Sequence, residues 1–140
     1  MLNRLPAAAI AGLLLVTGLV WRFVETRPQP QADFGVPLVE VMVPKFQGPE
    51  REGEDLFNDN CATCHGRNAA GQEGVAPPLV HRIYAPNHHA DGAFLLAAMK
   101  GARAHHWPFG DMPPVPGVTP EDVGKIVAYV RALQKANGVF

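Results

Sequence analysis

Residues 61–65 read Cys61-Ala62-Thr63-Cys64-His65, and they contain both cysteines of the 140-residue chain. Thiols three positions apart lie about one helical turn from each other, so both can bond to one bound group. The histidine beside the second thiol can then bring an imidazole nitrogen to the same group. Because no cysteine is left over, this short segment uses the whole thiol content of the chain.

The Cys-x-x-Cys-His pattern is typical of covalent attachment of haem c. We expect Cys61 and Cys64 to bond to the two vinyl groups of one porphyrin, and His65 to bind the iron as its proximal ligand. A thioredoxin-like dithiol would need a βαβ context, and nothing strand-like flanks the motif. A zinc site would need further ligands, for which the chain offers histidines but no second cysteine pair. A disulfide between the two cysteines would leave the histidine unexplained.

Met112 is the expected second axial ligand. A low-spin electron-transfer haem needs another strong ligand, and a thioether sulfur raises its potential. Met112 lies in Phe-Gly-Asp-Met-Pro-Pro-Val-Pro-Gly, residues 109–117, which can form neither a helix nor a central strand. Met99 lies in an apolar helical run with Asp91 as its expected N-cap and Gly101 at its end, where core packing explains it better. Met42 precedes the haem motif in a proline-rich stretch.

Residues 51–140 resemble a class I, single-haem cytochrome c in the order and spacing of several segments. These segments are Gly53, Leu56-Phe57, Asn60 to Gly66, Ala76-Pro77-Pro78-Leu79, Met99-Lys100-Gly101 and Met112-Pro113-Pro114. The resemblance implies an all-α fold with three to four short helices around one covalent haem. It also implies that the Pro77 carbonyl accepts a hydrogen bond from the second ring nitrogen of His65. The first and last helices of the family cross closely, here at Gly53, Phe57 and Tyr129.

The residues themselves predict helices at both ends of this domain. Residues 51–60 form the first helix, whose acidic start suits the helix dipole. The last helix begins with Thr119 as N-cap and Pro120 at its first position. Its apolar residues recur at helical spacing as far as Leu133, and Asn137-Gly138 ends it.

The N-terminal part of the chain is expected to hold it at a membrane. Leu5 to Val24 is an apolar run of about 20 residues, or roughly 30 Å of helix, which matches a hydrocarbon core. We therefore predict one transmembrane signal anchor over residues 1–24. A cleaved signal peptide is the alternative, although no small-x-small cleavage site follows the run. Residues 25–50 form a proline-rich connector, and its apolar part, residues 36–43, is expected to lie as a strand against the following domain or to dock on a membrane partner.

The histidines outside the motif are expected to lie at the surface or at the haem edge. They are His81, His88, His89, His105 and His106. Adjacent histidines point in different directions on most backbones, so each pair alone is a weak chelate. Trp107, His105, His106, Arg103 and Arg82 are the candidates for hydrogen bonds to haem propionates, and the sequence does not choose among them.

These features predict a one-electron carrier rather than an enzyme. The net charge of −1 and the pI near 6.6 leave no basic surface for nucleic acid. Haem c is attached outside the cytoplasm, so the domain is expected in the periplasm, tethered to the inner membrane within a respiratory-type chain. Its partners would be membrane redox complexes or other electron-transfer proteins. The alternative is a fixed cytochrome c subunit of a membrane oxidoreductase complex, and a haem sensor or peroxidase would require Met112 to leave the iron.

Overall fold

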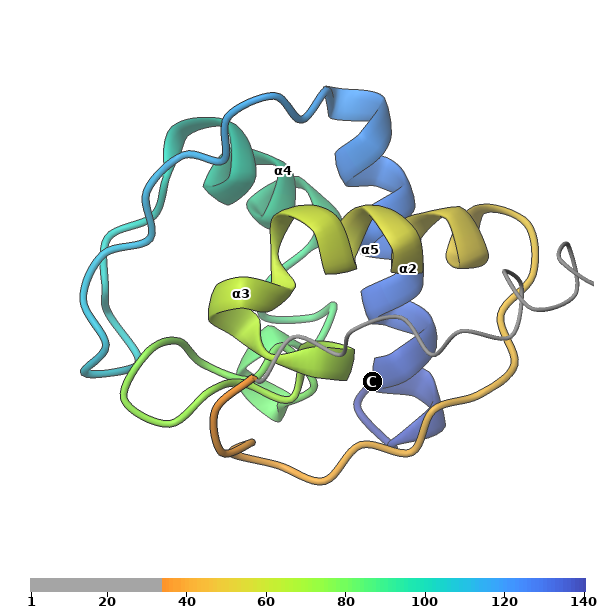
Figure 1. Ribbon diagram of the computed structural model, residues 1–140, viewed down its shortest axis with the longest axis horizontal. Helices are drawn as coiled ribbons and strands as arrows, with labels where there is room; N and C mark the ends of the chain where they lie inside the picture. Colours follow the sequence, from red (N-terminus) through yellow and green to blue (C-terminus); the bar gives the residue numbers. More distant parts are fainter. Residues whose placement is uncertain (1–33) are drawn as a thin grey trace, which may run out of the picture. The chain divides into compact units, whose positions relative to one another are not determined.

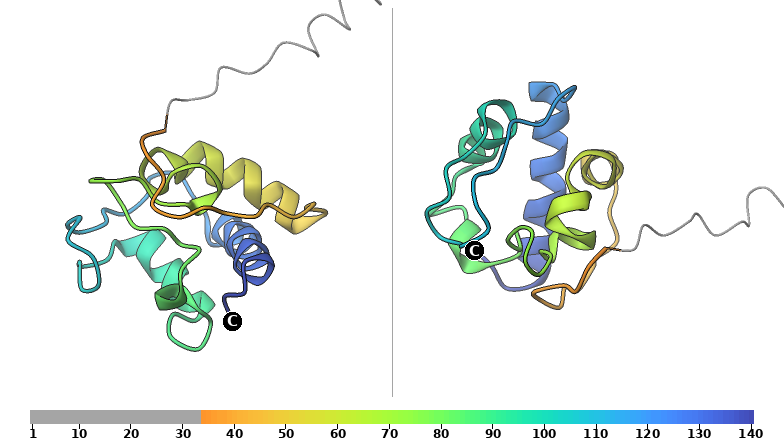
Figure 2. Two further views of the ribbon diagram at one scale, coloured as in Figure 1. Left: turned by 90° about the horizontal axis from the view of Figure 1, so that it is seen from below. Right: turned by 60° about the vertical axis from the view of Figure 1, so that its left-hand side comes forward.

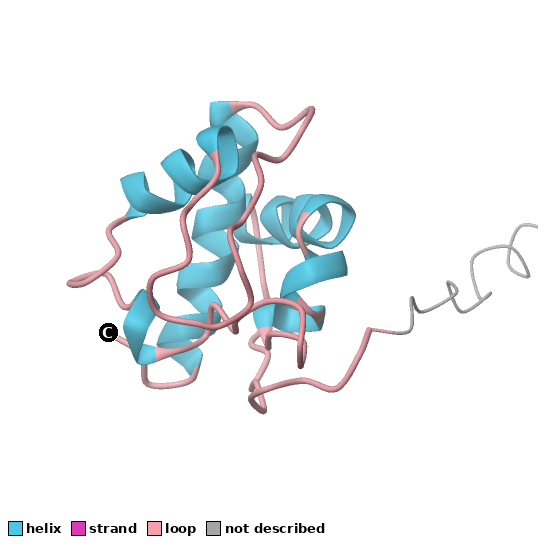
Figure 3. Cartoon of the chain, turned by 90° about the vertical axis from the view of Figure 1, so that its left-hand side faces the viewer, coloured by secondary structure: helices cyan, strands magenta, loops and turns pink. Residues whose placement is uncertain are grey.

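The computed structural model describes residues 34–140, and the anchor expected over residues 1–24 lies outside this part. Residues Phe34–Phe140 form one compact unit built of helices and loops, with no strand in this range (Figure 3). None of its helices has the length and apolar character needed to cross a membrane. In chain order the elements are α2 (Pro49–Asn60), α3 (Ala62–His65), the 3-10 turns η1 (Arg67–Ala69) and η2 (Arg82–Tyr84), α4 (Asp91–Lys100) and α5 (Pro120–Ala136).

The crossing of α2 over α5 forms the centre of the core (Figure 1). The crossing is so close that a Cβ atom on Gly53 would lie only 2.0 Å from the carbonyl oxygen of Lys125. Beside it the rings of Phe57 and Tyr129, both fully buried, have their centroids 5.4 Å apart. The contact expected at these three residues is therefore confirmed. The right-hand view of Figure 2 shows α2 nearly end-on beside α5.

The ends of α5 follow from local chemistry as expected. The Thr119 side chain accepts a hydrogen bond from the backbone nitrogen of Asp122, and the Asp122 carboxylate accepts one from Thr119 in return, which makes a capping box. Pro120 occupies the first turn, and the helix ends before Asn137. At α4 the expected N-cap is wrong. Ala90 holds that position, because Asp91 is the first helical residue and its carboxylate pairs with Arg131 at 2.8 Å.

The described part of the connector packs on the domain, but not as a strand. Phe34, Val41 and Phe46 contact the buried core. The backbone of Met42 makes two hydrogen bonds of 2.8 Å with the side chain of Asn137, so the segment is tied to the end of α5. The expected strand does not form because no neighbouring strand exists in residues 34–140 and two prolines, at positions 37 and 44, remove backbone donors.

Candidate functional site

A cavity of about 560 Å³ brings the expected site residues together. Its wall includes Cys61, Cys64, His65, Pro77 and Met112, and most of the remaining wall is apolar. This volume lies within the range of roughly 300–1,000 Å³ that is usual for cofactor pockets. Cys61 and Met112, which are 51 positions apart in the chain, thus line one space that can hold a large apolar group.

His65 is held in a defined orientation at the wall of this cavity. Its Nδ1 lies 2.9 Å from the carbonyl oxygen of Pro77, and the residue is only 8% exposed. A carbonyl can only accept, so Nδ1 carries the proton and Nε2 keeps a free lone pair. Burial lowers the pKa of His65, although the bond to Pro77 acts in the opposite direction. The ring is therefore a neutral imidazole whose Nε2 is ready to bind iron.

The backbone places the motif by a break between two helices. Cys61 ends α2 with its nitrogen bonded to the Phe57 carbonyl, and α3 starts at the next residue. The turn after His65 requires Gly66, whose φ is 71° and whose Cβ would lie 2.3 Å from the carbonyl oxygen of Gly71. The nitrogen of Gly71 in turn donates to the carbonyl of His65 at 2.7 Å. This turn returns the chain towards Pro77.

The two thiols are free, with Cys61 partly buried and Cys64 exposed. Burial, with a smaller contribution from Cys64, raises the pKa of the Cys61 thiol to about 11. At neutral pH Cys61 therefore stays protonated, whereas a reactive dithiol needs a thiolate. Within residues 34–140 neither cysteine belongs to a cluster of three potential metal ligands. This environment disfavours the dithiol and zinc alternatives.

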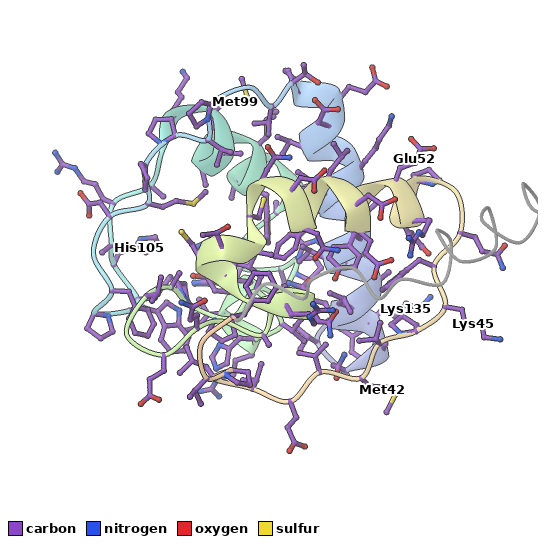
Figure 4. The ribbon with its side chains drawn as sticks, viewed as in Figure 1. Met42, Lys45, Glu52, Met99, His105 and Lys135 are labelled. Carbon is purple, nitrogen blue, oxygen red and sulfur yellow. The ribbon has the colours of Figure 1, made fainter. Side chains whose placement is uncertain are left out.

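Met112 is positioned by a short backbone pairing. Met112 and Ala102 exchange two hydrogen bonds, of 2.8 and 2.9 Å, which close the loop between α4 and α5. The carboxylate of Asp111 accepts a further bond of 2.8 Å from the nitrogen of Ala104. Of the methionines in the described part of the chain, Met112 lines the cavity and the other two do not. Met42 is 68% exposed and Met99 39% exposed, and Figure 4 shows Met42 pointing outward.

Two polar residues of α5 support the site, and neither was expected from the sequence. Gln134 is 1% exposed, and its amide donates to the carbonyls of Leu79 and Tyr84 at 2.8 and 3.0 Å. Arg131 donates to the carbonyls of Tyr84 and His89 at 2.7 and 2.5 Å. Together they fasten the irregular segment between Pro77 and α4 to α5. The sequence signal that could have identified such residues is a polar side chain at a position on the buried face of the last amphipathic helix.

Trp107 provides a test of whether the cavity fits haem. Its indole nitrogen is buried at the cavity wall and makes no hydrogen bond with any described residue. A buried donor of this kind is costly unless a ligand accepts from it. Haem carries propionate carboxylates that can accept this bond, and the thiols, the oriented imidazole and the apolar wall fit the rest of the group. The residues present therefore match haem c.

Comparison with known proteins agrees with this geometry. The profile of the family described as Cytochrome c matches residues 50–134. The chain is also 36% identical over 86 residues to the Cbb3-type cytochrome c oxidase subunit CcoP of Rubrivivax gelatinosus. The matched region covers 60% of this chain and 26% of that protein, so the chain spans about a quarter of the length of this relative. The family match covers more than half of the chain, and Cys61 and Cys64 fit the haem-attachment motif: the chain belongs to the cytochrome c family and carries covalent haem c.

Proposed function

We propose that the chain transfers single electrons through a haem c whose iron is bound by His65 and Met112. The observation that carries this proposal is the shared cavity, which joins both thiols, the oriented imidazole and one thioether. Haem c supplies reversible one-electron exchange between ferric and ferrous iron. The family match and the oxidase-subunit relative support this redox role.

The residues of the chain determine how that exchange is tuned. The Pro77 carbonyl fixes the His65 ring and raises its basicity as a ligand. The thioether of Met112 favours the reduced state and so raises the potential. Two strong protein ligands leave no coordination position for a substrate, which favours a carrier over a haem sensor or peroxidase. The apolar wall of the cavity limits water near the iron and shifts the potential in the same direction as the thioether.

We further propose that the domain works in the periplasm, tethered to the inner membrane by residues 5–24 in a respiratory-type chain. The length and apolar character of this run support a spanning helix. A tether raises the effective concentration of the domain near membrane partners. Strong electrostatic steering is then not required, in keeping with the net charge of −1.

The second candidate is a fixed cytochrome c subunit of a membrane oxidoreductase complex. The similarity to a subunit of a cbb3-type oxidase favours it. The two roles share the same haem chemistry and differ in whether the domain stays bound to one complex. Donor and acceptor would be membrane redox complexes or other electron-transfer proteins in both cases.

A native gel of gently solubilised membranes tests the two roles on the full chain. The gel is stained for haem and the protein is followed by a C-terminal tag. A haem band near the size of one chain supports the mobile tethered carrier. Co-migration with a large oxidase supports the subunit instead. Carbon monoxide added to the reduced protein tests the ligand set: the wild type should not bind it, and rapid binding would contradict ligation by Met112.

A further inference from the structure

Two histidine pairs that are far apart in the sequence meet beside the haem cavity. His88 and His89 precede α4, whereas His105 and His106 lie in the loop between α4 and α5. Nitrogen atoms of His88, His89 and His106 all lie within 4.8 Å of one another. His105 flanks them, with its ring centroid 4.2 Å from that of His106, and Figure 4 shows it on the side of the molecule away from Met42. Together the two pairs place three imidazole nitrogens close enough to share one cation.

The distance between two of these nitrogens matches metal ligation. The Nε2 atoms of His88 and His106 lie 3.3 Å apart. Two imidazole nitrogens bound to one tetrahedral zinc at 2.0–2.1 Å are separated by about 3.3 Å. A cation could therefore bind both rings without a large rearrangement of either segment.

The third histidine is oriented by the surrounding protein. Nδ1 of His89 lies 2.6 Å from the carbonyl oxygen of Ile83, so this nitrogen carries the proton and Nε2 has the free lone pair. The carbonyl of His89 accepts from Arg131 at 2.5 Å, which fixes the backbone as well. A hydrogen bond from the second ring nitrogen to a carbonyl is the usual support of a metal-binding histidine.

Neutral imidazole is the form that binds metals. The nearby guanidinium of Arg131 is paired with the carboxylate of Asp91 at 2.8 Å, which limits its repulsion of a bound cation.

We propose that His88, His89 and His106 form a binding site for one divalent first-row transition-metal cation. Three imidazoles suit Zn²⁺ and Cu²⁺, and the general order of affinities predicts tighter binding of Cu²⁺. His89 and His106 also line the haem cavity, whereas His88 does not. A bound cation would lie close to the haem and stabilise its reduced state by its charge. Metal binding at this site does not depend on the redox role proposed above, although a bound cation would influence it.

The test uses the haem-loaded protein without a polyhistidine tag, because thioether bonds then remove both thiols as competing ligands. Zinc chloride is titrated into it at pH 7 and followed by calorimetry. We expect one equivalent to bind, and His88→Gln or His106→Gln to weaken the affinity at least about tenfold. His81→Asn is the matched control, because it removes a histidine outside the cluster and keeps a side-chain acceptor for the nitrogen of Ile83.

Two further readouts locate the ion and separate copper from zinc. The electron paramagnetic resonance spectrum of added Cu²⁺ should show coupling to imidazole nitrogens in the wild type and lose it in His88→Gln. Zinc should raise the haem midpoint potential in the wild type and leave it unchanged in His88→Gln. The visible spectrum of that variant should stay that of the wild type, which separates loss of the metal site from loss of the haem. Failure of the wild type to bind either ion, equal affinity in the glutamine variants, or a potential that bound zinc does not move would overturn the proposal.

Discussion

Replacing Gly53 by alanine tests the packing on which the fold depends. A Cβ atom at this position would lie 2.0 Å from the carbonyl oxygen of Lys125 and 3.0 Å from Cβ of Tyr129. The shorter contact would have to lengthen to the 3.4 Å at which ordinary van der Waals contacts begin. Because the opposing atom belongs to the backbone of α5, a side-chain rotation cannot relieve the clash, and the two helices must move apart.

The expected loss follows from two opposing effects. Overpacking of a well-packed core costs about 1–3 kcal/mol, and the backbone clash places Gly53→Ala at the upper end. Alanine in place of glycine inside a helix returns up to about 1 kcal/mol. We therefore expect the free energy of unfolding to fall by about 2 kcal/mol, which lowers the urea midpoint by about 1 M.

Gly124→Ala is the matched control on the partner helix. It lies inside α5, and a Cβ there would meet no atom within 4 Å. Only the gain in helix propensity remains, so this variant should be more stable than the wild type by up to about 1 kcal/mol. The assay is urea unfolding of the haem-loaded protein followed by far-ultraviolet circular dichroism. Equal stability of the two variants would refute the close crossing as the basis of the core.

Three further changes test the ligand, the helix cap and the support of the site. Met112→Ala should lower the midpoint potential and allow the reduced haem to bind carbon monoxide, whereas Met99→Ala, outside the cavity, should change neither. Hydrogen bonds from Thr119 lower the pKa of the Asp122 carboxyl below its ordinary 3.8. These bonds therefore stabilise the fold above pH 3.8, and their contribution is lost as the pH falls through the lowered pKa. Asp122→Asn should thus unfold more easily at pH 7, with a difference from the wild type that shrinks below pH 3.8 in thermal melts. Gln134→Met should lose about 1–3 kcal/mol in urea unfolding, since it leaves the Leu79 carbonyl without its donor and the Tyr84 carbonyl with Arg131 alone.

The parts of the fold that the sequence predicts well are those set by nearby residues. The cap and end of α5 depend on Thr119, Pro120 and Asn137, which act within one turn of the helix end. The haem motif is equally local, because its two thiols and its imidazole share one short segment. The contact of Gly53 with Tyr129 is not local, and it was predicted only through the family resemblance.

Local sequence signals fail where a distant partner competes for the same residue. Asp91 has the residue type of an N-cap, but Arg131, 40 positions later, draws its carboxylate into an ion pair. The apolar connector has the composition of a strand, but the domain offers core contacts and single hydrogen bonds rather than a strand edge. In both cases the tertiary partner decided the outcome: Asp91 pairs with Arg131 instead of capping α4, and the connector contacts the core through single side chains such as Val41.

The histidine cluster shows how a site can arise from two weak local signals. Each adjacent pair is a poor chelate alone, and nothing near His88 in the sequence points to His106. Their meeting depends on two anchors: the exchange of hydrogen bonds between Ala102 and Met112, which closes one loop, and the bond from Arg131 to the His89 carbonyl, which fixes the other. The first of these anchors also presents the methionine to the cavity. A change in haem ligation at Met112 would therefore move the loop that carries His106, and the metal affinity of the cluster should respond to the state of the haem.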